Sequence, residues 1–200
     1  MDNPIAPPQR TGTAPQNWLL YLLIGCMPLA EFMQAGVVAF NAAPVMGTIG
    51  ASPEEYSLVA TLYAVVAIGM ISHHRWMMER LGWRLFIQLS CGLFGLGAVA
   101  CGLSDSLGMF VLGRILMAAG GASFMTAGRV LVNNIPPSPL RFNGIRSFAT
   151  GLAAGAVAGP VLAAAAMSAG SWQASFFALV PLAMIISLLA TFELQDCSRR

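Results

Sequence analysis

Charged side chains are scarce in this chain of 200 residues. Asp, Glu, Lys and Arg together make up 9% of it, and lysine is absent, so that all ten basic residues are arginine. Soluble domains carry about 25% charged residues, and this chain has too few to cover a soluble fold of its size. The formal net charge of +2 is also too small to indicate a nucleic-acid partner. The composition therefore argues against a soluble domain and against nucleic-acid binding.

Clusters of metal-ligating or catalytic side chains are also missing. His73 and His74 are adjacent, and adjacent side chains on a helix point about 100° apart, so the pair is expected in a solvated loop and not at a metal. No cysteine lies in a CxxC pair or near a histidine. The four cysteines are expected to be small apolar residues in helices: Cys26, Cys91, Cys101 and Cys197. Since the apolar segments hold no His/Asp pair or Ser/His set, we predict no metal, no cofactor and no enzymatic activity.

Apolar residues, in contrast, are abundant and come in long blocks. They make up 57% of the chain, and blocks of about 20 residues match the ~30 Å hydrocarbon core of a bilayer. We predict an all-α membrane protein: a disordered tail (1–17), a bundle of six transmembrane helices (18–192) and a C-terminal tail (193–200). The predicted spans are Trp18–Phe40, Glu54–Ile71, Leu85–Leu103, Leu107–Val132, Ile145–Met167 and Trp172–Thr191. The proline- and glycine-containing segments Asn41–Pro53 and Asn133–Gly144 are expected to be connections.

Arginines gather on one side of these six spans. The other side carries Glu54, Glu55 and Asp105 and no arginine. Cytoplasmic loops are enriched in arginine, so the arginine-rich side is expected to be cytoplasmic. We therefore predict a multi-pass protein of the cell membrane, an inner membrane where the cell has two, with both termini in the cytoplasm. The arginines on that side are Arg10, Arg75, Arg80, Arg84, Arg129, Arg141, Arg146, Arg199 and Arg200.

Two charged residues, Glu31 and Arg114, fall well inside predicted spans. At 1.5 Å per residue, both lie about 10 Å below the outer surface of the membrane. Ionisable groups are expensive in hydrocarbon and are functional candidates by default. We hypothesise that the two face each other, directly or through water or substrate, and carry proton coupling. The alternative is a static buried pair that orients two helices.

Further polar side chains lie on the face of the first span that carries Glu31. Gln34 and Asn41 fall three and ten residues later, within about 80° of Glu31 around a helix. A polar strip on an apolar helix faces protein or a water-filled cavity and not lipid. Gln34 and Asn41 are therefore predicted to line a cavity.

A ridge of small residues runs along the fifth predicted span. Gly151, Gly155 and Gly159 are spaced four apart, so they lie on one face, where another helix can approach closely. Pro160 follows, and it can kink the helix because it lacks a backbone donor.

These segments resemble a known family. The stretch from Gly151 to Pro160 resembles the antiporter signature of major facilitator drug exporters, in which the ridge and its Gly-Pro are associated with conformational switching. The segment that begins at Arg114 and ends at Gly121 is similar to a second motif, whose arginine is associated with proton coupling. The end of the first span, Phe40–Pro44, resembles that of the fourteen-span proton-linked drug exporters.

The link between the second and third spans resembles the cytoplasmic loop motif of the same family. Arg80 and Gly82 match it, while Glu79 and Arg84 stand where the family has aspartate and lysine. The entry to the sixth span, which begins at Trp172, is also similar to that of the family.

The resemblance implies the N-terminal six-helix half of a major facilitator transporter. Such a half would act in proton-coupled export of a small drug-like solute, paired with a second half-transporter chain or a second copy of itself, since alternating access needs two bundles. Its partners would be the lipid bilayer, protons and the solute. A truncated, non-transporting membrane protein or accessory subunit is the alternative. A channel is less well supported, because no selectivity filter or acidic ring is visible.

Overall fold

The structure, a computed structural model, describes residues 17–136 and 139–195. Within these residues, six helical segments are long and apolar enough to cross a membrane. The prediction of an all-α membrane protein with six transmembrane helices is therefore confirmed. Most of the two predicted tails, 1–16 and 196–200, lies outside the described residues. The remaining tail residues belong to helices, because the first helix begins at Asn17 and the last ends at Gln195.

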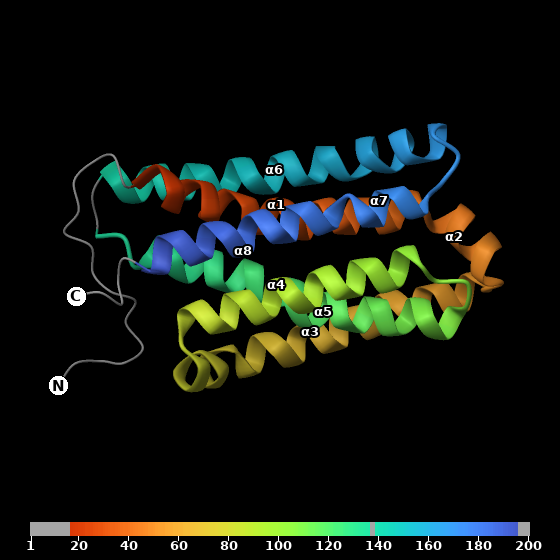
Figure 1. The fold of residues 1–200 in the computed structure, drawn as a ribbon, viewed down its shortest axis with the longest axis horizontal. Helices are drawn as coiled ribbons and strands as arrows, with labels where there is room; N and C mark the ends of the chain where they lie inside the picture. The colour runs from red at the N-terminus through yellow and green to blue at the C-terminus, as the bar shows by residue number, and fades with distance from the viewer. Residues whose placement is uncertain (1–16, 137–138, 196–200) are drawn as a thin grey trace.

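The helices lie side by side along the long axis of the molecule (Figure 1). In chain order they are α1 (Asn17–Phe40), α2 (Ala42–Ile49), α3 (Pro53–Leu81), α4 (Trp83–Gly102), α5 (Leu107–Asn133), α6 (Pro139–Ser168), α7 (Gln173–Phe177) and α8 (Leu179–Gln195). α1 packs most extensively on α6, and α4 on α5. Contacts between α1 and α5 join these two pairs, while α3 packs on α5 and α8 packs on α4 and α1.

α3 and α5 each begin directly after a serine that caps the helix. Ser52 and Glu55 form a capping box: the Glu55 backbone N–H donates to the Ser52 hydroxyl at 3.2 Å, and the Ser52 N–H donates to the Glu55 carboxylate at 2.8 Å. Pro53 occupies the first turn of α3, where a missing N–H costs nothing. The Ser106 hydroxyl likewise accepts from the Met109 N–H at the start of α5. These caps fix where two of the transmembrane helices begin.

The second transmembrane helix is longer than predicted. α3 continues past Ile71 to Leu81, and only Gly82, with φ +75°, separates it from α4. A positive φ is a conformation that glycine adopts readily, so the chain can turn there within one residue. The prediction of a solvated histidine loop was therefore wrong. His74 is 5% exposed, and its ring meets that of Phe86 edge-on at 4.8 Å between centroids.

Three other boundaries differ from prediction. The expected turn between the first two spans contains the short helix α2. α6 begins at Pro139, not at Ile145, since proline is compatible with the first turn of a helix. The last span is broken at Ala178, between α7 and α8. Pro181 accounts for this break, because its ring clashes with the carbonyl four residues earlier and removes a helical hydrogen bond.

The glycine ridge of α6 lies directly on the backbone of α1. A Cβ atom added at Gly155 would lie 2.5 Å from the Leu29 carbonyl oxygen, and one at Gly159 would lie 2.9 Å from the Gly36 Cα atom. Gly151 contacts the α1 backbone in the same way. No side chain fits between the two helices at these positions. α1 and α6 are therefore held backbone to backbone along their shared length.

A second backbone contact of this kind joins α4 and α5. A Cβ atom added at Gly97 would lie 2.6 Å from the Gly113 carbonyl oxygen. One added at Gly113 would lie 2.8 Å from the Cys101 nitrogen, and one at Gly120 would lie 2.6 Å from the Phe94 nitrogen. The bundle thus contains two closely packed helix pairs, α1–α6 and α4–α5, which meet where α1 contacts α5.

Candidate functional site

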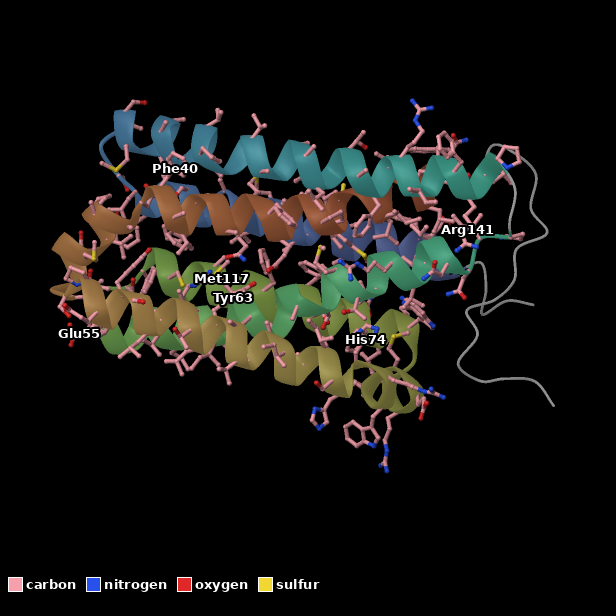
Figure 2. The ribbon with its side chains drawn as sticks, turned by 180° about the vertical axis from the view of Figure 1, so that it is seen from behind. Phe40, Glu55, Tyr63, His74, Met117 and Arg141 are labelled. Carbon is pink, nitrogen blue, oxygen red and sulfur yellow. The ribbon has the colours of Figure 1, made fainter. Side chains whose placement is uncertain are left out.

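The charged residues predicted inside the membrane meet where the two helix pairs join. Glu31 and Gln34 lie on α1, one turn apart, and Arg114 lies on α5. Tyr63 enters the same place from α3. Figure 2 shows Tyr63 and Met117, the residue one turn along α5 from Arg114, midway along the bundle. Three helices from separate parts of the sequence therefore build one polar cluster, which we call the Glu31–Arg114 cluster and define as Glu31, Gln34, Tyr63 and Arg114.

Glu31 and Arg114 are linked through the two other members of the cluster. The Arg114 Nη1 donates to the Gln34 Oε1 at 2.6 Å, and its guanidinium carbon lies 4.1 Å from the centre of the Tyr63 ring. The Gln34 Nε2 donates to the Tyr63 hydroxyl at 2.9 Å and to the Glu31 Oε1 at 3.2 Å. The Tyr63 hydroxyl donates to the same carboxylate oxygen at 2.6 Å. The two charges are bridged by an amide and a phenol and do not form a direct ion pair.

Two members of the cluster are buried, Glu31 and Tyr63 are half-buried, and the cluster still has unused hydrogen-bonding capacity. Arg114 is 5% exposed and Gln34 is 1% exposed. The Glu31 Oε2 and the Arg114 Nε are buried and have no hydrogen-bond partner. The Glu31 Oε2 lies against Gly121 of α5, where a Cβ atom would collide with it. Burying charged groups without full compensation is costly, so this arrangement is not one that stability alone favours.

Asn41 does not join the cluster. It lies directly after the last residue of α1, fully buried, and its Nδ2 donates to the Ser175 hydroxyl of α7 at 2.8 Å. A neighbouring bond runs from the Trp172 indole N–H to the Thr48 hydroxyl of α2, at 3.0 Å. These contacts tie the end of α1 and the short helix α2 to the start of the last span. The predicted role of Asn41 in lining a cavity stays a prediction.

The residues of the predicted loop motif lie where α3 meets α4. Glu79 and Arg80 belong to the last turns of α3, Gly82 is the linking residue, and Arg84 belongs to the first turn of α4. Glu79 accepts from the Arg75 Nε at 3.0 Å in an exposed ion pair, which contributes little to stability. The motif is therefore separated from the Glu31–Arg114 cluster by several helical turns.

The conformational residues predicted on α6 lie at its contact with α1. Pro160 lies against Gly36, where an added Cβ atom would come within 2.8 Å of the proline ring. The same face of α6 contacts Leu29, two residues before Glu31. The ridge and the cluster therefore share α1 as a common element.

Tyr63 was not identified from the sequence. It lies in an apolar span and carries no formal charge, so neither hydropathy nor charge marks it. The available signal was chemical, since a tyrosine hydroxyl at membrane depth needs a hydrogen-bond partner within the protein. Gly121 was identified only as part of a motif, and its contact with Glu31 depends on how α1 and α5 pack.

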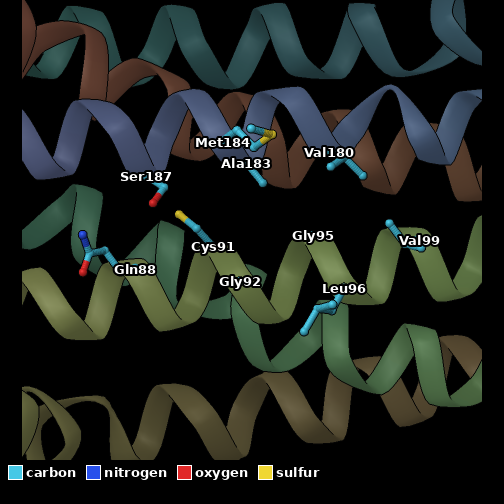
Figure 3. A pocket seen from close by; sticks show the side chains of 10 residues that line it. All are labelled: Gln88, Cys91, Gly92, Gly95, Leu96, Val99, Val180, Ala183, Met184 and Ser187. Carbon is cyan, nitrogen blue, oxygen red and sulfur yellow. The ribbon is translucent and has the colours of Figure 1, made fainter.

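A separate cavity of about 310 Å³ lies between α4 and α8 (Figure 3). Small side chains create it, and Gln88 at one end donates to the Thr191 hydroxyl at 2.9 Å. No charged residue lines it. Nor do three His, Cys, Asp or Glu side chains gather at a possible metal site anywhere in 17–136 and 139–195. Within this part of the chain, the Glu31–Arg114 cluster is thus the best candidate for proton chemistry.

A bundle of six helices that are long and apolar enough to span a membrane, with a polar cluster between them, is the architecture of a multi-pass helical membrane protein. The sequence model of the Major Facilitator Superfamily matches residues 20–196, and the chain belongs to this family. The resemblance to one six-helix half of such a transporter is confirmed.

Curated relatives cover nearly the whole chain. "Uncharacterized transporter YebQ" of Escherichia coli (strain K12) is 32% identical over 186 residues, which are 92% of this chain and 38% of that protein. "Putative multidrug resistance protein MdtD" is 28% identical over 181 residues in Salmonella paratyphi B and 30% in Salmonella typhi, covering 89% of this chain and 37% of those proteins. The chain thus spans little more than a third of the length of these relatives.

Proposed function

We propose that this chain forms one half of a transporter that couples proton movement to the export of small, drug-like solutes. The observation that carries the proposal is the Glu31–Arg114 cluster, in which opposite charges lie at the contact between two closely packed helix pairs. The names of the MdtD relatives are consistent with the solute class. The second half would come from another chain, from a second copy, or from further sequence of the same chain.

In this mechanism, the protonation state of Glu31 sets how strongly α1 and α5 attract each other. An ionised Glu31 is drawn to the Arg114 guanidinium, whereas a protonated Glu31 is neutral and is not. The bridge through Gln34 would rearrange between these two states. Because α6 contacts the α1 backbone without intervening side chains, α1 and α6 would move as a unit. Proton binding would thereby be converted into a change of helix packing, as a coupled transporter requires.

The arginine-rich end is proposed to be cytoplasmic. Glu54 and Glu79 lie at opposite ends of α3, and Glu79 belongs to the arginine-rich end. Figure 2 shows Glu55 at one end of the bundle, and His74 and Arg141 at the other. Apart from Arg114, the described arginines lie toward the same ends of α3, α4, α5 and α6, which the positive-inside rule makes the cytoplasmic ends.

Single cysteines at Glu54 and Glu79 are expected to react from opposite sides of the membrane. Both substitutions, E54C and E79C, remove one exposed acidic residue of α3, so they are matched in charge. In intact cells, with the native cysteines replaced by serine, a membrane-impermeant maleimide should label E54C and spare E79C until the cells are permeabilised. The reverse pattern would invert the proposed orientation.

Glu31→Gln is expected to abolish transport driven by a pH gradient. Glutamine is nearly the same shape and keeps a hydrogen-bond acceptor for Tyr63, but it cannot bind and release a proton. The measurement is ethidium movement into proteoliposomes with an imposed pH gradient, comparing the chain as it stands with E31Q. E54Q, which removes an exposed carboxylate far from the cluster, is the matched control and should transport normally.

Two results would count against the proposal. If E31Q keeps its gradient-driven transport, Glu31 is not the proton site. If the unsubstituted chain moves no ethidium with or without a gradient, this chain does not transport that dye class, and the accessory-subunit alternative is favoured.

A further inference from the structure

The two oxygens of the Glu31 carboxylate have different surroundings. The Oε1 accepts hydrogen bonds from the Tyr63 hydroxyl at 2.6 Å and from the Gln34 Nε2 at 3.2 Å. The Oε2 is buried, has no hydrogen-bond partner and lies against Gly121. The Oε1 is therefore engaged in two hydrogen bonds. The Oε2 occupies space that is available only because Gly121 has no side chain.

Tyr63 touches every other member of the cluster, as Gln34 does, but it comes from a different helix than Glu31. Its hydroxyl donates to Glu31 and accepts from Gln34, and its ring faces the Arg114 guanidinium at 4.1 Å. A guanidinium over an aromatic ring is stabilised without an anionic partner. Tyr63 therefore satisfies both charges at once and holds them apart.

Few other ionisable groups act on Glu31. Among the described residues, those that influence its carboxyl are Arg114 from α5 and Tyr63 from α3, together with the neutral Gln34 of its own helix. From α4, the apolar ring of Phe94 lies beside Gly121, the glycine that the Glu31 Oε2 contacts. The charged residues of α6 and α8 lie near the ends of those helices. The orientation of the carboxyl is thus decided within the cluster.

We propose that Tyr63 is a positioning residue that keeps the Glu31 carboxyl turned away from Arg114 and reserves its Oε2 for the proton. This inference rests on the proposed proton coupling. In the step, a proton from a hydronium ion forms one O–H bond at the Oε2, a water molecule is left, and the carboxylate charge changes from −1 to 0. No covalent bond of the protein breaks. Gly121 provides the space in which the Oε2 sits, and Tyr63 keeps the carboxyl in that space.

Removing the Tyr63 hydroxyl should change the proton affinity of Glu31 in a direction that depends on what Tyr63 does. If Tyr63 only stabilised the ionised carboxylate by donating to it, its removal would make Glu31 easier to protonate. If Tyr63 instead holds the carboxyl away from Arg114, its removal frees the carboxylate to pair with the guanidinium, and protonation becomes harder. The two roles therefore predict shifts of opposite sign.

The test measures Glu31 protonation directly. Dicyclohexylcarbodiimide, a membrane-soluble reagent, reacts with protonated carboxyl groups, and the fraction of modified Glu31 is read by peptide mass spectrometry over a pH series. The 200-residue chain in lipid vesicles, without any solute, is the sample. For Tyr63→Phe, which keeps the ring, we expect the pH of half-maximal modification to fall by about one unit, a tenfold change in proton affinity. An unchanged or higher midpoint would overturn the proposal.

Two further variants sharpen the result. Tyr56→Phe is the matched control, because Tyr56 also lies on α3 and donates to α1, at the Val38 carbonyl at 2.8 Å, but does not touch Glu31. It should leave the midpoint unchanged, and an equal shift would show a general effect of loosening α3. Gly121→Ala should reduce modification of Glu31 at every pH, since the added methyl group occupies the position of the Oε2. Unreduced modification in this variant would also contradict the proposal. Since no transport is measured, absence of ethidium movement would count against the proposed function without affecting this result.

Discussion

Replacing Gly155 with leucine is expected to leave little or no folded bundle. Even a single Cβ atom at this position would lie 2.5 Å from the Leu29 carbonyl oxygen and 2.9 Å from the Leu29 Cα. Both are backbone atoms, so α1 as a whole would have to move away from α6. Overpacking of a tight core costs about 1–3 kcal/mol for added methylenes that can be accommodated, and Gly155→Ala should fall in that range. Leucine adds three more carbons with no space to enter.

The measurement is the apparent melting temperature and the monodisperse fraction of the protein in detergent. Ala156→Leu is the matched control, since Ala156 is the next residue of α6 and is exposed. It should fold as the unsubstituted chain does, while G155A melts earlier and G155L does not yield a monodisperse species. If G155L were as stable as A156L, the backbone contact between α1 and α6 would be absent.

The ridge on α6 was visible in the sequence, but its partner was not. Glycines at a spacing of four residues mark one face of a helix regardless of what packs there. On α1, the facing residues include Gly25 and Gly36, which are separated by Leu29 and other larger residues, so no matching ridge can be recognised. Because α1 makes this contact with backbone atoms, which every residue has, its amino-acid sequence gives little information about the contact. The partner of the ridge became known only from the packing.

The charged members of the cluster could be predicted, whereas the way they are joined could not. Glu31 and Arg114 stand out because formal charge is rare in a membrane span. Gln34 follows from Glu31 by helical spacing. Tyr63 comes from a different helix, and its position beside Glu31 depends on the rotation of α3 about its axis, which the largely apolar sequence around Tyr63 does not determine. The sequence was thus informative about depth and uninformative about rotation.

Helix ends were predicted less well than spans, for a physical reason. Hydropathy marks where a segment leaves hydrocarbon, not where its backbone stops being helical. α3 therefore continues through polar residues beyond Ile71 until Gly82 permits the turn. The segment Asn133–Gly144 is expected to be a connection because of its prolines, yet Pro139 begins α6, because the effect of proline depends on its position in the helix.

Arg114→Leu is expected to destabilise the bundle and to abolish gradient-driven transport. The substitution leaves the Glu31 carboxylate without its opposite charge, and removing one partner of a buried charge pair costs about 3–5 kcal/mol. Keeping Glu31 protonated would avoid this cost, but the carboxyl would then no longer alternate between its protonated and ionised states. Arg114→Lys keeps the charge and loses the planar group that both donates to Gln34 and stacks on Tyr63, so it should retain stability better than transport.

The double variant Glu31→Gln with Arg114→Leu decides between a working proton site and a static pair. Removing both charges eliminates the uncompensated group, so the apparent melting temperature should return to, or exceed, that of the unsubstituted chain. If the pair only orients α1 and α5, ethidium transport should return with stability. If Glu31 and Arg114 carry the coupling, the double variant should be as stable as the original and still show no response to a pH gradient. Melting temperature and transport measured on one preparation therefore separate the two interpretations, and recovery of both would reject proton coupling at this site.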